Sequence, residues 1–410
     1  MVSSTIDHMV AVMAFLAATL LFIGLFNQTI QTGVIYQRHK ALATKASDLL
    51  DTILLNPGIP ANWGISDKEP TGFGIQDPEF TQYKLSPFSL MRLCSFAGEP
   101  VCYLNVTSGE PMFYSNITVG SAAYLLMPYS EVLNYSSALR ILGLNGTYGF
   151  QLTLTPMIKV SINETNTSPL TFSISASGLG LSFANATVNY LLLKFLLDGD
   201  YPRLDDTNSS VTYTDKMGNA LVTFDSLHVD DDESVTYCFI AYVHLGGLTG
   251  VGYYVRVPIN GPTIVPFVNS LASGEVLLAH SDDVPYTGGS SSGYALNYTA
   301  IFVPVVKNEF QESKWTVSGT ILPGPSYNHK ITIPSIGEPG ILVVAYNNTV
   351  SGGVVLVPWG VGSLGFPVVF GNDPAKQEWV ATDTRQVLVS GIAYQVKLAL
   401  WSLEGYQVVS

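Results

Sequence analysis

The sequence predicts a mainly β protein that carries one long N-terminal α-helix. An uncharged apolar run, Met9–Phe26, opens a stretch without helix breakers that reaches Leu55. Short β-prone runs, separated by Gly, Asn and Asp clusters, fill most of residues 170–410. Charged residues make up only 12% of the chain, while Tyr, Thr, Ser, Val and Gly are abundant. Such a composition is typical of extracellular β-sandwiches.

The helix prediction rests on the first 55 residues. Met9–Phe26 would span roughly 27 Å at ~1.5 Å per residue, close to the ~30 Å hydrocarbon core of a bilayer. No proline interrupts the chain before Asn56-Pro57-Gly58, so we expect the helix to end there. Its second half carries a stripe of apolar residues at spacings of three, four and seven: Ile35, Leu42, Ala46, Leu49, Leu50 and Ile53. This stripe predicts docking on a globular head or on a partner helix.

A secretory signal peptide is the main alternative for the apolar run. Signal peptides have a basic start, a shorter apolar core and a small-residue cleavage site. Here no Lys or Arg precedes Met9, and no A-x-A site follows the run directly. We therefore expect a retained single-pass anchor in contact with membrane lipid.

Potential N-glycosylation sites indicate which side of the membrane the bulk occupies. The Asn-x-Ser/Thr pattern occurs at 11 of the 21 asparagines, whereas the Ser and Thr content predicts about three or four by chance. Besides Asn27, the candidate acceptors are Asn105, Asn116, Asn134, Asn145, Asn163, Asn166, Asn185, Asn208, Asn297 and Asn347. The excess favours an exported, glycosylated surface.

Charge gives a different indication. Arg38, Lys40 and Lys45 follow the apolar run, and the positive-inside rule would place the bulk in the cytoplasm. The rule weakens for long translocated domains, so we give the sequons and the composition more weight. The net charge of −13 and the lack of a basic stripe argue against nucleic-acid binding.

Turn-rich segments suggest four units: a helix over 1–55, a mixed α/β head over 56–162, and β-sandwiches over 170–260 and 263–410. The head contains a predicted short helix, Tyr135–Gly143, and a closing strand, Tyr148–Ile162. The polar stretch Asn163–Pro169 is the expected linker.

Apolar, β-prone runs predict the strands of the two sandwiches. They are Leu170–Ile174, Ala186–Leu192, Ala220–Phe224, Val235–Val243, Gly252–Val257, Glu275–Ala279, Tyr294–Val305, Trp315–Ile321, Ile331–Ile333, Ile341–Tyr346, Gly353–Pro358, Phe366–Phe370, Val387–Val389 and Ala393–Leu400.

Motifs that would carry chemistry are weak. Gly289–Gly293 matches a hydrolase nucleophile elbow but lies in a Gly/Ser-rich loop, and Gly360–Gly365 matches a dinucleotide fingerprint but precedes a predicted strand. The six histidines lack metal-ligand spacing, and the acidic run Asp230–Glu233 more often forms a solvated loop than a calcium site. We therefore expect no enzyme, metal or cofactor.

Three cysteines are present. Cys94 and Cys102 bracket a turn-rich loop, where either a disulfide or two unpaired small side chains fits the sequence. Cys238 lies in an apolar run and is expected to be a buried thiol.

Residues 1–160 resemble archaeal type IV pilin-like membrane proteins. The matching features are the apolar start, the unbroken helix through Lys45–Asp51 and the exit Leu54–Trp63. The resemblance implies a helix that packs into a filament core or anchors one subunit, with the head outward. It also implies that Asp7 could neutralise the terminal amine of a neighbouring subunit. No basic-Gly leader precedes the apolar run.

Residues 170–260 resemble bacterial-type Ig-like or carboxypeptidase-regulatory-like modules through Ala184–Val188 and Thr214–Ala220. Such modules are spacers or adhesion domains. Together these features predict an extracellular structural protein, assembled through or anchored by its helix as a homo-oligomer or filament. The alternative is an anchored adhesin that recognises surface glycans or a partner through its C-terminal sandwich, with Tyr286, Tyr294 and Trp359 as candidate contacts.

Overall fold

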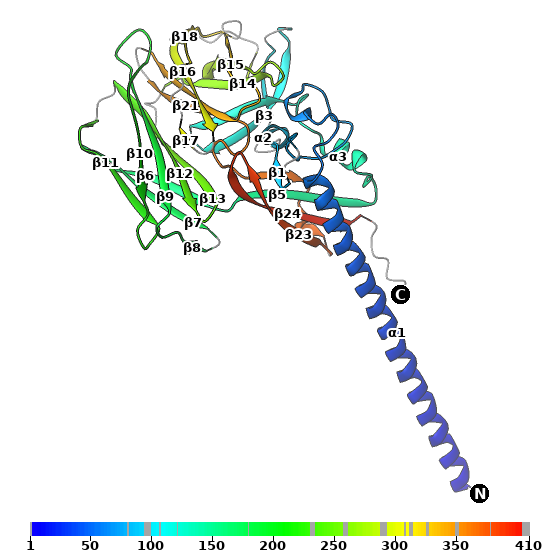
Figure 1. Cartoon of the computed structure of the whole chain (residues 1–410). Coiled ribbons are helices and arrows are strands. Elements are labelled where there is room, and N and C mark those ends of the chain that lie inside the picture. Colours follow the sequence, from blue (N-terminus) through cyan, green and yellow to red (C-terminus); the bar gives the residue numbers. More distant parts are fainter. Residues whose placement is uncertain are drawn as a thin grey trace.

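The computed structural model describes residues 2–79, 82–93, 100–105, 108–120, 122–178, 180–229, 234–256, 261–287, 293–306, 309–310, 315–324, 328–348, 352–377 and 379–403. A head built mainly of β-sheets sits at one end of a single long helix, and most of that helix projects from the head (Figure 1). The predicted class, mainly β with a long N-terminal helix, is confirmed.

Helix α1 covers Val2–Leu54, in agreement with the predicted 1–55 helix. It ends just before Asn56-Pro57-Gly58, and Gly58 adopts φ +87°, a left-handed conformation that favours glycine. The short 3₁₀ helix η1, Trp63–Ile65, follows this turn. The chain thus leaves the helix through a tight turn rather than through a flexible linker.

A five-stranded sheet lies closest to the helix (Figure 1). Its strands are β1 (Lys84–Leu85), β23 (Ala381–Val389), β24 (Ile392–Ser402), β5 (Tyr148–Pro156) and β22 (Val368–Gly371), in that order. It joins strands from the predicted head to strands from the end of the chain. The apolar side chains of its inner face, such as Leu152 and Leu398, belong to the main core of the head.

A second, mixed sheet has eleven strands in the described part of the chain. They are β2 (Val101–Leu104), β3 (Pro111–Gly120), β4 (Ala123–Pro128), β14 (Ile264–Ser270), β15 (Glu275–His280), β16 (Leu296–Val306), β17 (Glu309–Phe310), β18 (Thr316–Ile321), β19 (His329–Thr332), β20 (Gly340–Asn347) and β21 (Gly352–Trp359). Strand β4 lies between β21 and β14 and runs parallel to both.

The predicted division into a 56–162 head and a separate 263–410 sandwich is therefore wrong. Both sheets combine strands from the two segments, and one continuous core fills the space between them. The physical reason is that β4 has a strand of the later segment on either side, so neither segment can form its sheet alone. We call this combined unit the body.

The intervening residues form a β-sandwich inserted into the body. One sheet has the order β10-β9-β12-β13 and the other the order β11-β7-β6, with β8 paired to β7. The strands are β6 (Lys159–Thr167), β7 (Leu170–Gly178), β8 (Leu181–Ser182), β9 (Thr187–Leu196), β10 (Arg203–Tyr213), β11 (Asn219–Phe224), β12 (Val235–Leu245) and β13 (Leu248–Val255). Aromatic residues such as Phe172 and Phe239, stacked at 4.4 Å, fill its core.

The sandwich begins earlier than predicted. The expected linker, Asn163–Pro169, is the end of β6 and the turn into β7, and the predicted strand Tyr148–Ile162 is divided between β5 and β6. The outer face of β9 and β12 packs on the body through residues including Leu193 and Ile240. The unit predicted as 170–260 is thus one sandwich over 159–255, fixed to the body along one face.

Short helices complete the fold. Helix α3 (Tyr135–Ile141) confirms the prediction over 135–143, and its N-cap Asn134 accepts a hydrogen bond from the backbone of Ser136. Helix α2 (Pro87–Met91) was not predicted. The 3₁₀ turns η2 (Ser281–Asp283) and η3 (Pro374–Lys376) lie in connections between strands.

Candidate functional site: the projecting helix and its seat

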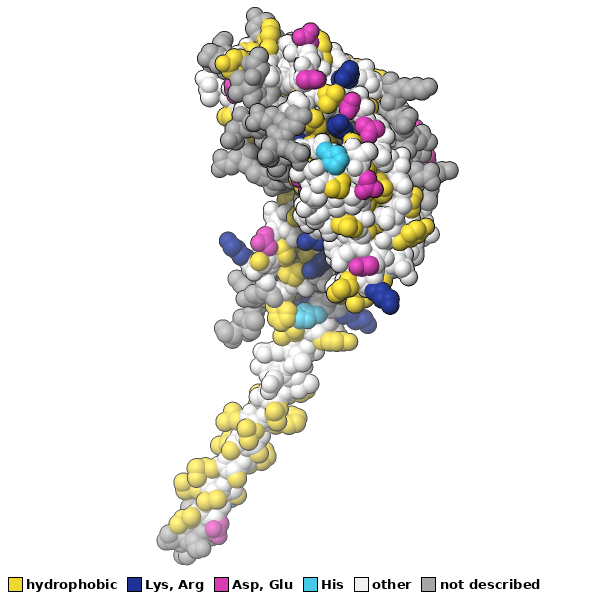
Figure 2. Space-filling view, turned by 90° about the vertical axis from the view of Figure 1, so that its left-hand side faces the viewer, with side chains coloured by type: hydrophobic (Ala, Val, Ile, Leu, Met, Phe, Trp, Pro, Cys, Tyr) yellow, Lys and Arg dark blue, Asp and Glu magenta, His cyan; other side chains and the backbone are white. Residues whose placement is uncertain are grey.

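The helix divides into a projecting part and a part held by the head. Every residue from Ile6 to Arg38 is exposed, and the segment is long and apolar enough to cross a membrane. A signal sequence near an N-terminus meets the same criterion. Figure 2 shows apolar side chains gathered along the far part of the helix and a stretch with few of them nearer the head.

We call Met9–Phe26 the span and Asn27–Gln37 the neck. The neck contains no charged residue; its polar side chains are Asn, Gln, Thr and Tyr. The hydroxyls of Thr29 and Thr32 each donate to a backbone carbonyl four residues earlier, at 2.8 Å. These two hydroxyls are satisfied within the helix, whereas the amide side chains of the neck point outward and are exposed.

The last turns of α1 form what we call the seat. Six apolar side chains here are buried in the core of the head: Leu42, Ala46, Leu49, Leu50, Ile53 and Leu54. They lie against β23 and β24. The predicted docking stripe is confirmed from Leu42 to Ile53, while Ile35, its first member, is 41% exposed and lies in the neck.

A polar clamp holds the edge of the seat. Arg385 on β23 donates through Nε to Asp51 Oδ1 at 3.2 Å and through Nη2 to the Ser47 hydroxyl at 3.1 Å. It also donates through Nη1 to Asp383 Oδ1 at 2.7 Å. Burial raises the pKa of Asp383, but hydrogen bonds from Ser47, the Thr384 amide and Arg385 outweigh it and leave that pKa below its ordinary value.

Aromatic rings mark where the helix leaves the head. The rings of His39 and Trp379 lie 4.2 Å apart, and Trp379 is 38% exposed. The Lys45 ammonium lies 4.6 Å from the centre of the Tyr148 ring, within cation–π range. Lys45 is one of the three cations from which the positive-inside rule would place the bulk of the chain in the cytoplasm. Here it is part of the seat.

A buried arginine, Arg92, holds the turn that follows α1. Arg92 is 1% exposed and donates to the backbone carbonyls of Trp63, Ser66, Lys68 and Glu131. Trp63 is fully buried and donates through Nε1 to the Gly74 carbonyl at 2.8 Å. Four carbonyls gathered on one guanidinium make this exit rigid.

Glu131 is the second buried charge-bearing group at this exit. It is 7% exposed, and Oε2 has no hydrogen-bond partner among the described residues. Burial raises the pKa of Glu131 to about 8; Asp67 adds to the rise and Arg92 opposes it. The side chain therefore keeps its proton at neutral pH.

The remaining predicted site residues are spread over the molecule. Asp7 is exposed near the free end of α1. Cys94, Asp230–Glu233 and most of Gly289–Gly293 lie outside the described residues, so the predicted disulfide with Cys102 on β2 stays a prediction. Cys238 is fully buried, as expected.

Two other predictions concern the sheets. Gly360–Gly365 leads into strand β22, which is not the helix a dinucleotide fingerprint needs. Trp359 was predicted as an exposed contact, which is wrong: it is fully buried, and its indole donates to the Ile336 carbonyl at 3.2 Å. Among the described residues no group of three or more His, Cys, Asp or Glu side chains could hold a metal ion.

The sequons differ in accessibility. Of the ten on the head, six are exposed: Asn134, Asn145, Asn163, Asn166, Asn185 and Asn208; three are half-buried: Asn105, Asn116 and Asn297. Asn347 is 5% exposed, and its amide nitrogen donates to the carbonyls of Leu197 and Gly199 at 2.8 and 2.9 Å. A glycan on that nitrogen would break these bonds, so the prediction of Asn347 as an acceptor does not fit the fold.

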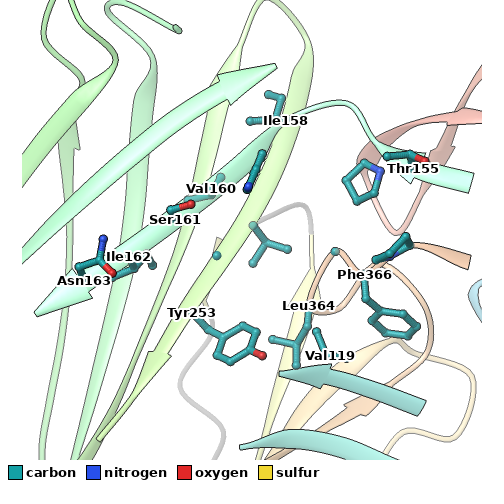
Figure 3. Close-up of a pocket in the computed structure, with 16 residues that line it drawn as sticks. Val119, Thr155, Ile158, Val160, Ser161, Ile162, Asn163, Tyr253, Leu364 and Phe366 are labelled. Carbon is teal, nitrogen blue, oxygen red and sulfur yellow. The ribbon is translucent and has the colours of Figure 1, made fainter. Parts of the chain in front are cut away.

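A groove of about 640 Å³ lies between the body and the inserted sandwich. Figure 3 shows side chains of the sandwich, among them Val160 and Tyr253, on one side and Val119, Leu364 and Phe366 of the body on the other. Gly250 and Gly252 let β13 approach β6 closely, because a Cβ on either would lie 2.5–2.7 Å from Ile158 or Val160. The lining of the groove is mixed, because polar residues such as Ser161, Asn163 and Tyr253 stand among the apolar ones.

Sequence reasoning missed Arg385, Asp383 and Trp379, which complete the seat. Arg385 is separated from Asp51 by 334 residues, and no local pattern marks such a pair. The exit turn was predicted from Asn56-Pro57-Gly58, but Arg92 carries no motif that would reveal its burial.

Comparisons with known proteins add little. No protein-family model and no curated protein matches the chain. Among solved structures, the chain is similar to trypsin-activated alpha-2-macroglobulin from Escherichia coli (11% identity, TM-score 0.21, covering 72% of this chain and 23% of that one) and to its native conformation (11%, 0.22, 71% and 22%). It is also similar to red sea bream transglutaminase (9%, 0.20, 60% and 37%). The chain spans less than two fifths of each neighbour, and TM-scores this low carry no argument about fold or activity.

Proposed function

We propose that the chain is a structural subunit of a cell envelope, with the head outside the membrane and the helix packed beside copies of itself in a pilus-like filament. The observation that carries this proposal is the projecting part of α1. It has 33 exposed residues, Ile6–Arg38, about 50 Å of helix at 1.5 Å per residue. A bilayer core of ~30 Å would cover the span and leave the neck uncovered.

The sequence of the neck gives an isolated helix little intrinsic stability. Of its eleven residues, five are β-branched and one is Gly33, and none can form an ion pair along the helix. Isolated helices of this composition are marginal in water, since both propensity and side-chain pairing are weak. Neighbouring helices would supply the missing contacts, and outward amide side chains such as Gln31 would hydrogen-bond between them.

Retention of the helix is supported by its continuity. Span, neck and seat form one uninterrupted α1, and the first A-x-A pattern after the span, Ala41-Leu42-Ala43, lies 15 residues beyond Phe26. Asp7 would then lie near the start of the assembled helices, where the resemblance to pilin-like proteins assigns it to a neighbour's terminal amine. An outside location is supported by the six exposed sequons on the head.

A single near-isosteric charge in the neck tests the proposal. Gln31→Glu would bury a carboxylate between helices at a cost of several kcal/mol, so filaments should fall at least tenfold. The same change at exposed Gln395 on β24 is the control and should leave filaments intact. Electron microscopy of surface filaments, with the chain identified by antibody, gives the count.

The amount of membrane-associated chain must be measured beside the filament count. It should be equal in both variants, because the span is unchanged. If Gln31→Glu forms as many filaments as the control, the neck faces water and the filament proposal fails.

The groove favours a second candidate, an anchored binding protein. Its mixed lining, in which Ser161, Asn163 and Tyr253 stand among apolar side chains, would suit a sugar ring. Because residues 263–410 do not form a sheet alone, the full chain in detergent is the form to apply to a glycan array. Binding that Tyr253→Ala abolishes would support this function, and an array without signal would count against it.

A further inference from the structure

Strand β10 is an unusually open sheet edge. It has 11 residues, Arg203–Tyr213, and is the outermost strand of the sheet β10-β9-β12-β13. In the part of the chain that the structure describes, no strand pairs with its outer side. Most of its residues are exposed, and the strand lies at the side of the molecule away from α1 (Figure 1). Such an edge is a template for pairing with another chain.

Proteins protect open edges with charges, prolines or bulges. The first part of β10 has two of these devices: Arg203, Asp205 and Asp206 are charged, and the pairing shifts between Leu204 and Asp206. The second part, Thr207–Tyr213, has none of them. It pairs with β9 without a register shift, and none of its residues is charged. Val211 and Tyr213 are 52% and 64% exposed.

The unprotected part contains the sequon Asn208-Ser209-Ser210. Asn208 is exposed and pairs directly with Leu192, which is buried in the sandwich core. Paired residues point to the same face of a sheet, so Asn208 points toward the second sheet. The edge of that sheet is β11, which follows β10 in the chain and carries Leu221 at 64% exposure. One substituent on Asn208 would therefore stand beside both open edges.

We propose that an N-linked glycan on Asn208 shields the edges of β10 and β11 and prevents them from pairing with a second copy of the chain. A hydrated glycan would block the approach of another strand by its bulk. The inference rests on the proposed extracellular location of the head, because only an exported head would be glycosylated.

The test begins with glycopeptide mass spectrometry of the protein isolated from its native host, where Asn208 should be modified. Ser210→Ala removes the sequon while Asn208 stays in place. In detergent micelles this variant should at least double its weight-average mass by analytical ultracentrifugation, relative to Asn145→Gln. The control removes an exposed sequon in the turn before β5, away from both edges.

A second substitution shows whether the edge causes the association. Val211→Lys places a charge on the open strand, so the double variant Ser210→Ala/Val211→Lys should return to the mass of the control. Ser210 and Val211 are both exposed, so neither change disturbs the sandwich core.

Several results would overturn the inference. If Asn208 is unmodified while other sequons carry glycans, the inference fails although the proposed location stands. If no sequon is modified, the inference fails, and the filament count of Gln31→Glu still judges the proposed function separately. If Ser210→Ala keeps the mass of the control, or if Val211→Lys does not reverse the association, the glycan does not guard this edge.

Discussion

The two halves of α1 are one continuous helix in opposite surroundings. From Leu42 to Leu54 six apolar side chains are buried in the core of the head, and Asp51 is paired with Arg385. From Ile6 to Arg38 every residue is exposed, including large apolar ones such as Phe15 and Leu20 at 72% and 69%. The same backbone is therefore stabilised by tertiary packing at one end and must find its apolar contacts outside the chain at the other.

Charge follows the same division. The seat region carries acidic and basic residues that make specific contacts with the head, while the span and neck contain none from Met9 to Gln37. A surface that faced water along this whole length would not lack charge. The difference fits the proposal that lipid or neighbouring helices surround the projecting half.

Truncating a leucine in each half gives the largest predicted contrast. Leu50→Ala should destabilise the head by about 2–5 kcal/mol, because it leaves a cavity in a packed core. Leu20→Ala removes the same atoms from an exposed position and should change head stability by under about 0.5 kcal/mol. Denaturant unfolding in detergent, followed by tryptophan fluorescence, measures both. Equal effects would mean that the head does not depend on the seat.

A smaller effect, on the change in head stability per pH unit, is predicted for Glu131, the buried acid at the helix exit. The folded pKa of Glu131 is about 8, whereas an unfolded Glu has a pKa of about 4.3. Since the folded state binds the extra proton between these values, stability should fall as pH rises from about 4 to 8, by at most ~1.4 kcal/mol per pH unit.

Glu131→Gln keeps a neutral side chain of similar shape at every pH. It should flatten this dependence and remove most of the loss of stability that wild type shows between pH 4 and pH 8. Unfolding free energies at pH 5 and pH 8 provide the comparison. A wild-type head that is equally stable at both values would show that Glu131 is ionised in the fold.

The sequence predicted those elements whose signal is local. The strands with buried, β-prone runs, such as β12 and β20, were found because apolar residues alone define them. Strand β10 was missed because an exposed edge has no apolar pattern, and β14 because it follows a turn-rich boundary. The interleaved body was not predictable, since nothing in Ala123–Pro128 announces that β4 lies between β14 and β21.

The candidate site divides in the same manner. The span, the helix end and most of the docking stripe follow from hydrophobic periodicity and helix breakers, which act over a few residues. The clamp could not be predicted in this way, because Arg385 and Asp51 are more than 300 residues apart in the sequence. Trp359 was predicted to be exposed because tryptophan is common on binding surfaces, yet here it fills the core. Sequence patterns therefore predicted the projecting half of α1 more completely than the contacts of the seated half.

The smallest predicted effect concerns Asp383 on β23, a carboxylate of the clamp that holds the seated half of α1. The folded pKa of Asp383 lies below its ordinary value, despite burial, because Ser47, Thr384 and Arg385 donate to it. A depressed pKa adds stability above the unfolded value of about 3.9, and that stability is lost as pH falls through the folded pKa. Asp383→Asn should therefore cost under about 1 kcal/mol at pH 7, and the gap to wild type should narrow as the pH falls toward the folded pKa.

Asp7→Asn is the matched control for that measurement, because Asp7 is an exposed carboxylate on the projecting half. Its unfolding midpoint should follow wild type at every pH. If the Asp383→Asn gap does not narrow at all as the pH is lowered through the acid range, the clamp acts through shape rather than charge. If Asp7→Asn also shifts the midpoint, the projecting half is coupled to the head, and the division of α1 into an independent projecting half and a seated half would have to be given up.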